Sequence, residues 1–201
     1  MRTPLSARLF QYWTELRAGR PMPLRTQIDP ASLASILPDL FILEAEADGD
    51  HRLRLAGTRV CTLFGRELRG TPFSRLWRRD QHRQTARTAR RVLEEARPMS
   101  LAAAATTLHD DRLRFDIPLF PLADPDGQPT RLLGAMDMIG LQMSEAALPI
   151  IVLEQTGLSV IVPPPAPAPD NEKDRSADHD WRWKGAARRL GPLGILDGGL
   201  S

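Results

Sequence analysis

The chain has 201 residues, of which 42% are hydrophobic and 26% are charged, and its formal net charge is +2. These values are typical of an ordinary globular protein with one good core and at most a small appendage. The net charge is too small to predict a polyanionic partner for the whole molecule. Lys173 and Lys184 are the only lysines, so nearly all of the positive charge is arginine and its abundance alone predicts little.

The sequence also argues against a disulfide-bonded, secreted or membrane-spanning protein. Cys61 is the only cysteine, so the chain forms no internal disulfide or thiolate cluster. The N-terminus has no apolar core of secretory length before charges resume. No uninterrupted apolar run approaches the roughly 20 residues that a membrane helix needs. We expect a soluble, cytoplasmic protein without a transmembrane segment.

The first elements predicted are helical. Apolar residues recur at helical spacing over residues 5–18, and this pattern ends in an Ala-Gly-Arg-Pro segment. An extended, proline-punctuated segment over 21–30 leads to a second short helix over 31–40. Asp29 is suited to cap that helix, and Pro30 suits its first position.

A hairpin and a helical region follow. Residues 41–44 and 52–57 read as two strands joined by an Asp-Gly-Asp turn at 48–50. Short helices broken by glycine and proline occupy 58–77. The longest helical pattern runs over 80–96 and stops before a proline.

Three more strands are predicted after this helix. Residues 99–107 form a weak candidate because alanine is a poor strand former, whereas 112–122 alternate strongly between apolar and polar. A clear turn at 124–127 leads to the last strand, over 131–142. The order predicts an α+β domain, with helices on one face of an antiparallel sheet.

The C-terminal part changes character. Residues 148–163 are apolar and predict either a further hairpin around Gly157 or a partner-docking strand. From Pro163 the chain is rich in proline and then in charge, and cannot bury enough surface to become ordered. It ends in a basic and aromatic peptide that contains Trp181 and Trp183.

A set of segments, taken in order, is similar to a known family. The segments are Trp13 with Leu16-Arg17-Ala18-Gly19-Arg20, Pro23 and Arg25 before Ile28-Asp29-Pro30, Leu37-Pro38 before Phe41-Ile42-Leu43, Arg54-Leu55-Ala56-Gly57-Thr58, Phe64-Gly65-Arg66-Glu67-Leu68-Arg69-Gly70, and Leu119 with Pro121-Leu122. Each motif is weak alone, but their order and spacing are fairly specific. Over roughly residues 8–145, the chain resembles the bacterial proteins in which one PAS domain makes up most of the protein.

The resemblance implies a PAS fold, with a five-stranded antiparallel sheet and helices packed on one face. We expect an N-terminal helical cap and extended segment over 1–30, a PAS domain over 31–145 and an apolar extension over 146–162. A disordered linker and terminal peptide follow over 163–201. The resemblance also implies a sensor or regulatory module without enzymatic activity, and it defines no ligand.

A PAS pocket lies between the inner face of the sheet and the helices that cover it. The pocket candidates are Leu53, Leu55, Phe64, Phe73, Phe115, Ile117 and Met136. The alternative is that these side chains fill an ordinary core, and sequence does not separate the two.

We expect no cofactor. Light-sensing PAS relatives carry their flavin-adduct cysteine in an Asn-Cys-Arg-Phe-Leu-Gln context, whereas Cys61 follows valine and precedes threonine, which favours a small buried filler. Haem-sensing relatives use a histidine on the long helix, but His82 has polar and charged neighbours. The histidines show no metal-ligand spacing, so no metal is expected either.

Four arginines share one face of the long helix, and they could bind an anion or an acidic partner through bidentate hydrogen bonds. They are Arg79, Arg83, Arg87 and Arg90. The alternative is a solvated face in an arginine-rich chain. For a homodimer, the N-terminal helix with Trp13 and Leu16 is the candidate contact.

Nothing in the sequence assembles a catalytic site, because the carboxylates of Asp29, Glu67, Asp116 and Asp137 are scattered and suit caps, helix ends or strands. We therefore predict a non-enzymatic regulatory module that contacts a separate effector protein. The alternative is a sensor that binds a small molecule or nucleotide in the pocket or on the arginines. Nucleic-acid binding is a weaker third hypothesis. The terminal tryptophans are either a docking peptide or without a role.

Overall fold

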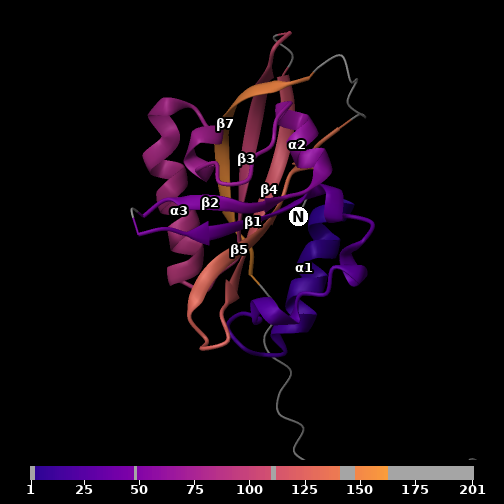
Figure 1. The fold of residues 1–201 in the computed structure, drawn as a ribbon, viewed down its shortest axis with the longest axis vertical. Helices are drawn as coiled ribbons and strands as arrows, with labels where there is room; N and C mark the ends of the chain where they lie inside the picture. The colour runs from indigo at the N-terminus through magenta and orange to yellow at the C-terminus, as the bar shows by residue number, and fades with distance from the viewer. Residues whose placement is uncertain (1–2, 48, 110–111, 141–147, 163–201) are drawn as a thin grey trace, which may run out of the picture. The chain divides into compact units, whose positions relative to one another are not determined.

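The computed structural model describes residues 3–47, 49–109, 112–140 and 148–162 (Figure 1). Its helices are α1 (Pro4–Arg17), α2 (Thr58–Phe64) and α3 (His82–Glu94), with 3₁₀ turns η1 (Arg25–Gln27), η2 (Ala31–Leu33), η3 (Leu37–Asp39), η4 (Phe73–Leu76) and η5 (Arg79–Gln81). Its strands are β1 (Leu40–Ala45), β2 (His51–Ala56), β3 (Met99–Thr107), β4 (Arg112–Ala123), β5 (Pro129–Ala135), β6 (Asp137–Met138) and β7 (Ile150–Val160).

The strands form one antiparallel sheet in the order β2-β1-β5-β4-β3-β7, and the short β6 pairs with β4. The predicted α+β class and the five expected strands are confirmed. The structure adds β6 and β7 to them. The alanine-rich β3 is a complete strand because it is paired on both sides, by β4 and β7, and such pairing outweighs a weak intrinsic preference.

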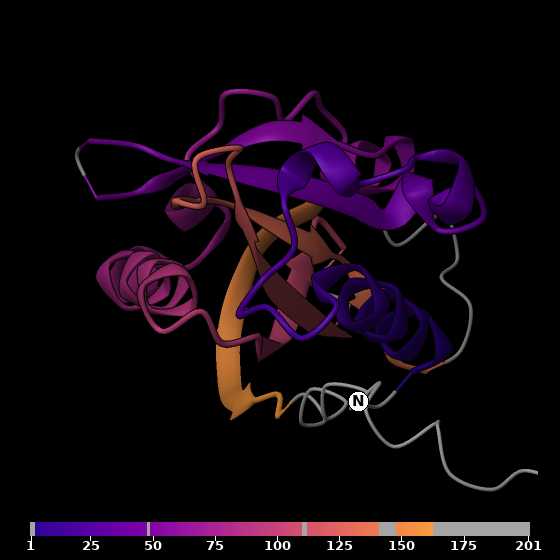
Figure 2. The ribbon, with the colours of Figure 1, turned by 90° about the horizontal axis from the view of Figure 1, so that it is seen from below.

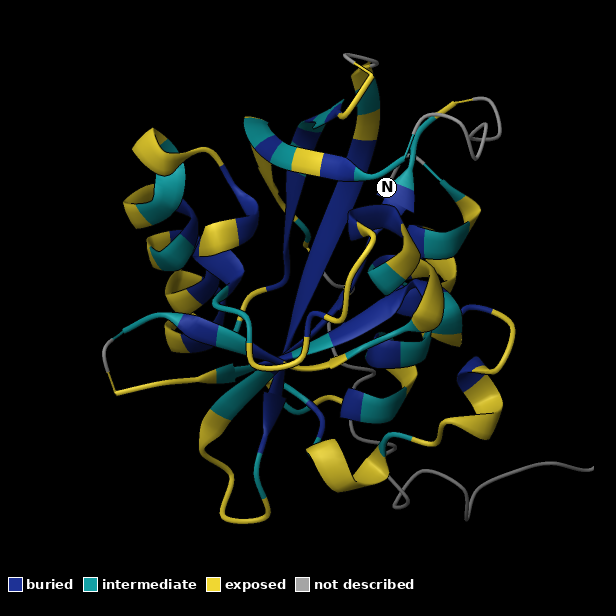
Figure 3. Cartoon of the chain, turned by 45° about the horizontal axis from the view of Figure 1, so that its top comes forward, coloured by how far each residue is buried: buried dark blue, intermediate teal, exposed yellow. Residues whose placement is uncertain are grey.

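Two hydrophobic clusters occupy the two faces of the sheet. Phe115, Ile117 and Leu119 of β4 pack with α2 and α3, as the predicted alternation requires. Phe120 and Leu122 point to the opposite face and pack with α1. Figure 2 shows α1 and α3 on opposite sides of the strands. Figure 3 shows buried residues along the central strands and exposed residues on the outer sides of the helices.

Helix α1 begins and ends as its sequence predicts. Thr3 is the N-cap, with its side chain accepting a hydrogen bond from the backbone N–H of Ser6, and Pro4 occupies the first helical position. Ala18 ends the helix in a left-handed conformation at φ 45°, and its N–H bonds to the Glu15 carbonyl.

The predicted short helix over 31–40 is instead two 3₁₀ turns, η2 and η3. The Asp29 carboxylate accepts hydrogen bonds from the backbone N–H groups of Ala31 and Ser32, at 3.0 and 3.1 Å. These bonds support the predicted capping role. The Ser32 hydroxyl donates a third hydrogen bond to this carboxylate and is the main cause of the lowered pKa of Asp29. The backbone bonds also contribute, because all of them stabilise the ionised form.

Gly57, in the Arg54–Thr58 motif, packs against the Leu37-Pro38 motif. Its N–H donates to the Leu40 carbonyl at 2.8 Å, between β2 and α2. A Cβ atom at this position would lie only 2.3 Å from the backbone oxygen of Pro38. The Leu-Pro turn before β1 can therefore pack against the end of β2 only because residue 57 is glycine.

Strand β7 extends the sheet beyond β3. It is continuous through Gly157, so of the two alternatives predicted for this segment the hairpin around that residue is wrong. Its outer edge is partly covered, because the Arg78 N–H donates to the Leu153 carbonyl at 2.8 Å and the Gln81 side chain bonds both backbone groups of Gln155. A covered edge is protected from pairing with other chains.

Candidate functional site

The candidate site is a cleft of about 760 Å³ at the junction of α1, α2 and the β4–β6 pair, which we call the α1–α2 cleft. Its apolar wall consists of Leu5, Leu63, Phe115, Met136, Met138 and Leu148. Its polar wall consists of Asp39, Thr58, Arg59, Thr62 and Asp137, and Pro38 completes the lining. An apolar wall with a few converging polar groups is the usual composition of a small-molecule site.

Arg59 and Asp39 form an ion pair on the polar wall, with 2.5 Å between the Nη1 and Oδ2 atoms. Asp39 comes from the turn before β1 and its side chain is only 8% exposed, whereas the Arg59 side chain on α2 is 57% exposed. The guanidinium therefore reaches inward from the surface, and the two opposite charges neutralise each other.

Asp137 and Asp116 lie side by side where β6 pairs with β4, and both are buried. The backbone N–H and the hydroxyl of Ser6 donate to the Oδ2 atom of Asp137, at 2.8 and 2.5 Å. The Ser6 hydroxyl is also 3.5 Å from Asp116, and the Ser100 hydroxyl donates to Asp116. Because Ser6 lies in the first turn of α1, this network fixes the start of the helix to the sheet.

The environment of Asp137 disfavours its ionised form. Burial raises the pKa of Asp137, and the nearby carboxylates of Asp116 and Asp39 raise it further, while the hydrogen bonds from Ser6 oppose the shift. Within the described part of the chain, neither Asp137 nor Asp116 forms an ion pair. The site therefore holds more acidic than basic groups.

The structure separates the predicted pocket residues into three groups. Phe115 and Met136 line the α1–α2 cleft. The other buried candidates, all at most 6% exposed, lie in the core between the sheet and its covering helices and do not line the cleft; they are Leu53, Phe64, Phe73 and Ile117.

The remaining pocket candidate, Leu55, is 44% exposed, so its predicted inward orientation is wrong. The register between β1 and β2 shifts, because Leu43 pairs with Leu53 while its neighbour Ile42 pairs with Leu55. The extra residue on β2 reverses the alternation of side chains beyond it. Leu55 is therefore paired with Ile42, which packs toward α1.

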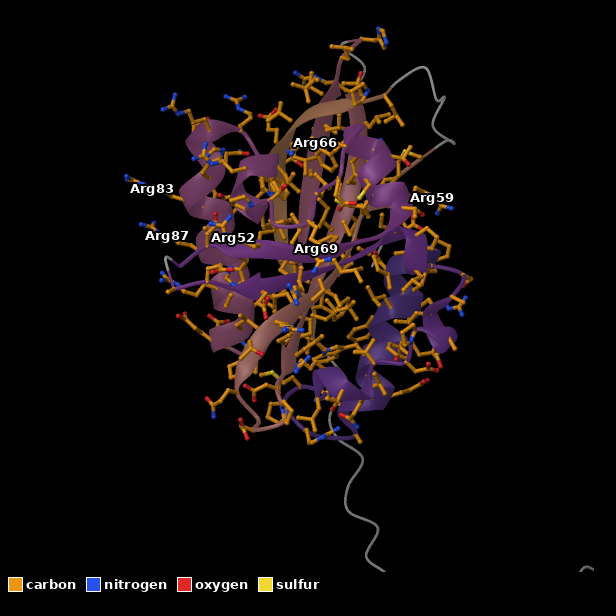
Figure 4. The ribbon with its side chains drawn as sticks, in the orientation of Figure 1. Arg52, Arg59, Arg66, Arg69, Arg83 and Arg87 are labelled. Atoms are coloured by element: carbon orange, nitrogen blue, oxygen red, sulfur yellow. The ribbon has the colours of Figure 1, made fainter. Side chains whose placement is uncertain are left out.

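The four predicted arginines are all exposed; they are Arg79, Arg83, Arg87 and Arg90. We call them the arginine surface. Arg79 lies in the turn η5 and not in the long helix α3, so its predicted place on that helix is wrong. Figure 4 shows Arg83 and Arg87 pointing away from α3, on the side of the molecule opposite Arg59. Arg90 pairs with Glu94 at 3.6 Å, but Arg79, Arg83 and Arg87 have no acidic partner among the residues with described positions.

The role predicted for Trp13 as a dimer contact conflicts with its burial. Its side chain is fully buried, its ring centroid lies 5.7 Å from that of Phe120, and its Nε1–H donates to the Pro121 carbonyl at 2.9 Å. These contacts fix α1 to its own sheet, so the ring is not available to a second copy. Leu16, one turn later, is half-buried.

Other predicted positions lie apart from the cleft. Cys61 is half-buried and its sulfur is 3.7 Å from the Glu67 carboxylate, while His82 Nε2 is 2.9 Å from the Trp77 carbonyl. Trp181 and Trp183 lie outside the described residues. The described helices include none that is both long and apolar enough to span a membrane.

Asp39, Arg59, Asp137 and Ser6 were not predicted as site residues. Asp137 and Asp116 each interrupt an otherwise apolar run, GAMDMIGL and FDIPLF, and a carboxylate in such a run must find buried partners. The sequence therefore contained a signal for these two carboxylates. It contained none for the contact with Ser6, because that contact joins residues 131 positions apart.

Several solved structures share similarity with the chain. A LOV protein of Rhodobacter sphaeroides is 17% identical, with a TM-score of 0.42, over 56% of this chain and 69% of its own. A LOV domain whose description concerns a flavin analogue is 15% identical, with a TM-score of 0.45, over 55% and 83%. A sensory box histidine kinase/response regulator of Burkholderia thailandensis is 14% identical, with a TM-score of 0.36, over 55% and 85%.

These neighbours contradict the expectation that no cofactor is involved and that flavin in particular is absent. The expectation rested on the residues around Cys61, and these concern only a photochemical thiol adduct. The exclusion of flavin is therefore withdrawn.

The family is established by the sequence itself. No curated protein matches the chain. The chain matches the family described as PAS domain over residues 1–137, which is more than half of its length and includes α1 and the strands up to β5. The match agrees with the resemblance carried by the ordered motifs and with the observed α+β fold. The chain therefore belongs to the PAS domain family.

Proposed function

We propose that the chain is a non-enzymatic sensory module in signalling that binds a small molecule in the α1–α2 cleft. Membership of the PAS domain family supports a signalling role. The cleft is the main observation that supports the proposal. Its volume of about 760 Å³ falls in the range of ligand pockets, and its lining combines apolar and polar groups. We propose that the PAS domain spans residues 31–145 and that α1 acts with it.

Helix α1 is the element through which occupancy of the cleft would be transmitted. Leu5 lines the cleft, and the next residue, Ser6, is hydrogen-bonded to Asp137 on the polar wall. A molecule bound there changes the contacts of the first turn of α1, while Trp13 holds the helix further along. A separate effector protein that contacts α1 would then respond to the ligand.

Ligand-dependent thermal stabilisation tests this proposal. A ligand that binds only the native state at 100 times its Kd stabilises the protein by about 2.7 kcal/mol. Pools of metabolites and nucleotides should therefore raise the Tm of the wild type. Thr62 is exposed on α2 and lines the cleft, so Thr62→Trp should obstruct the site and abolish the shift.

Arg69→Trp is the matched control, since it introduces the same ring at an exposed position that neither lines the cleft nor belongs to the arginine surface. It should respond to the same pools as the wild type. If no pool raises the Tm of the wild type, or if Thr62→Trp responds equally, the cleft is not the ligand site.

The arginine surface supports a second candidate function, the binding of an acidic protein partner. Arg83 and Arg87 are like charges four residues apart on α3, and like charges at that spacing destabilise an isolated helix. A partner that supplies carboxylates would relieve this repulsion and form bidentate hydrogen bonds. This candidate requires no occupant in the cleft.

Retention on immobilised polyglutamate tests the second candidate. The double variant Arg83→Glu with Arg87→Glu should elute at lower salt than the wild type, because it reverses two charges of the surface. Arg66 and Arg69 are exposed and lie away from α3, so their double change to Glu makes the same change in net charge elsewhere. Equal elution of both double variants would show that only net charge matters.

A further inference from the structure

The charges of the α1–α2 cleft indicate which chemical class of molecule it accepts. Its ionisable lining groups are Asp39, Arg59 and Asp137. Asp39 and Arg59 are paired at 2.5 Å and neutralise each other. Asp137 is therefore the lining group whose charge is left without a partner of opposite sign within the described part of the chain.

Asp137 has hydrogen-bonding capacity left for a ligand. The side chain is 96% buried, since its relative exposure is 4%. Both donors from Ser6 go to its Oδ2 atom, and no described residue donates to its Oδ1 atom. A buried carboxylate is poorly stabilised without a cation or further donors. The raised pKa of this carboxyl has the same cause.

The apolar wall of the cleft favours a ligand with an apolar body. Leu63, Phe115 and Met136 are buried members of the hydrophobic core that also line the cleft, and Leu5 and Leu148 extend this wall. Apolar groups placed against it gain about 25 cal/mol per Å² of surface removed from water. An anionic ligand could reach the remaining donors of Arg59, but Asp39 already neutralises that charge and the ligand would also approach Asp137, so charge complementarity disfavours it.

We propose that the molecule bound in the α1–α2 cleft is an amphipathic cation, in which a protonated amine pairs with Asp137 and an apolar body contacts the apolar wall. The proposal rests on the proposed sensory function of the cleft and adds the chemical class of the ligand. The amine also supplies the positive charge that the Asp137–Asp116 pair lacks.

Three probes of one size and different charge test the class: phenethylamine, phenethyl alcohol and phenylpropanoate. Each is titrated into the full chain at neutral pH and followed by NMR chemical shifts, which give both the Kd and the location of binding. The amine should bind at least about tenfold more tightly than the alcohol, the usual effect of one charge-assisted hydrogen bond. The carboxylate should bind most weakly.

Asp137→Asn keeps the shape of the side chain and an oxygen acceptor for Ser6 but removes the charge. In this variant the amine should bind at most about threefold more tightly than the alcohol, because nearly all of the charged interaction is lost. Asp126→Asn removes one charge from an exposed turn outside the cleft and should keep the preference. Thr62→Trp should weaken all three probes.

Three outcomes overturn the ligand class and, taken alone, leave the sensory function standing. In the first, the alcohol or the carboxylate binds in the cleft as tightly as the amine. In the second, the preference for the amine survives in Asp137→Asn. If none of the probes binds in the millimolar range expected for ligands of this size, the class is wrong. If the metabolite pools also fail to raise the Tm, the sensory function is wrong as well.

Discussion

Ser6 and Asp137 are 131 residues apart in the sequence and form two hydrogen bonds, from the backbone N–H at 2.8 Å and from the hydroxyl at 2.5 Å. The contact joins the first turn of α1 to the strand that follows β5. It replaces hydrogen bonds that a helix N-terminus otherwise makes with water. The same carboxylate lines the α1–α2 cleft, so one residue connects the candidate ligand site with the N-terminal helix.

Removing this carboxylate should destabilise the protein. In Asp137→Ala the buried Ser6 loses the acceptor of both of its short hydrogen bonds. It keeps only longer contacts, from its N–H to Thr3 at 3.4 Å and from its hydroxyl to Asp116 at 3.5 Å, so we expect a loss of about 1–3 kcal/mol. Asp137→Asn retains an oxygen at the same place and should lose much less. Urea unfolding with a common m value measures both. Equal losses in the two variants would show that the hydrogen bonds to Ser6 contribute little.

Stability should depend on pH through Asp137. Its pKa in the folded protein is raised above the ordinary value of 3.8, so the folded state holds this proton more tightly than the unfolded state. The stabilising contribution is complete below 3.8 and is lost as the pH rises through the folded-state pKa.

The free energy of unfolding is measured for the wild type and Asp137→Asn at pH values from below 3.8 upward. The difference between the two proteins separates the contribution of Asp137 from that of the other carboxylates. The advantage of the wild type over Asp137→Asn should decrease as the pH rises. A difference that stays constant, or increases with pH, would contradict the raised pKa.

Gly57 should tolerate no side chain. Gly57→Ala places a Cβ atom 2.3 Å from the Pro38 carbonyl oxygen, so backbone must move, and overpacking of this kind costs about 1–3 kcal/mol. Gly157→Ala is the control, because its Cβ would be 3.4 Å from the Ala102 Cβ, an ordinary contact. Thermal unfolding should separate the two variants, and similar Tm values would disprove the close approach at Gly57.

Trp13 should contribute to folding and not to self-association. Trp13→Ala removes a fully buried ring and should cost about 3–5 kcal/mol. Leu16→Ala, at a half-buried position of the same helix, should cost less. Unfolding free energy and solution mass are measured for both. If Trp13→Ala keeps the stability of the wild type but dissociates a dimer, the assignment of this ring to the core is wrong.

Much of the fold was predictable from local patterns. The apolar alternation of β4 and the motifs at either end of the β1–β2 hairpin are visible in the sequence, and the structure confirms these elements. Leu55 was misplaced because a register shift reverses the alternation, and only strand pairing reveals that shift. Gly157 suggested a turn, but pairing with β3 holds it within β7.

The candidate site was less predictable than the fold. Asp137 could have been singled out as a carboxylate within an apolar run, but its meaning depends on Ser6 and Asp116, which distant elements bring to it. The pairing of Asp39 with Arg59 likewise joins a turn before β1 to α2. Such contacts arise from tertiary packing and leave no local periodicity to detect.

Native mass spectrometry of the full chain tests the central claim, that the α1–α2 cleft holds a small molecule. The wild type and Arg69→Trp are incubated with metabolite pools that include flavins and amphipathic amines, and then compared with Thr62→Trp. We predict one discrete added mass on the wild type and on Arg69→Trp, and none on Thr62→Trp. The absence of any added mass on the wild type, or the same added mass on all three proteins, would contradict the claim.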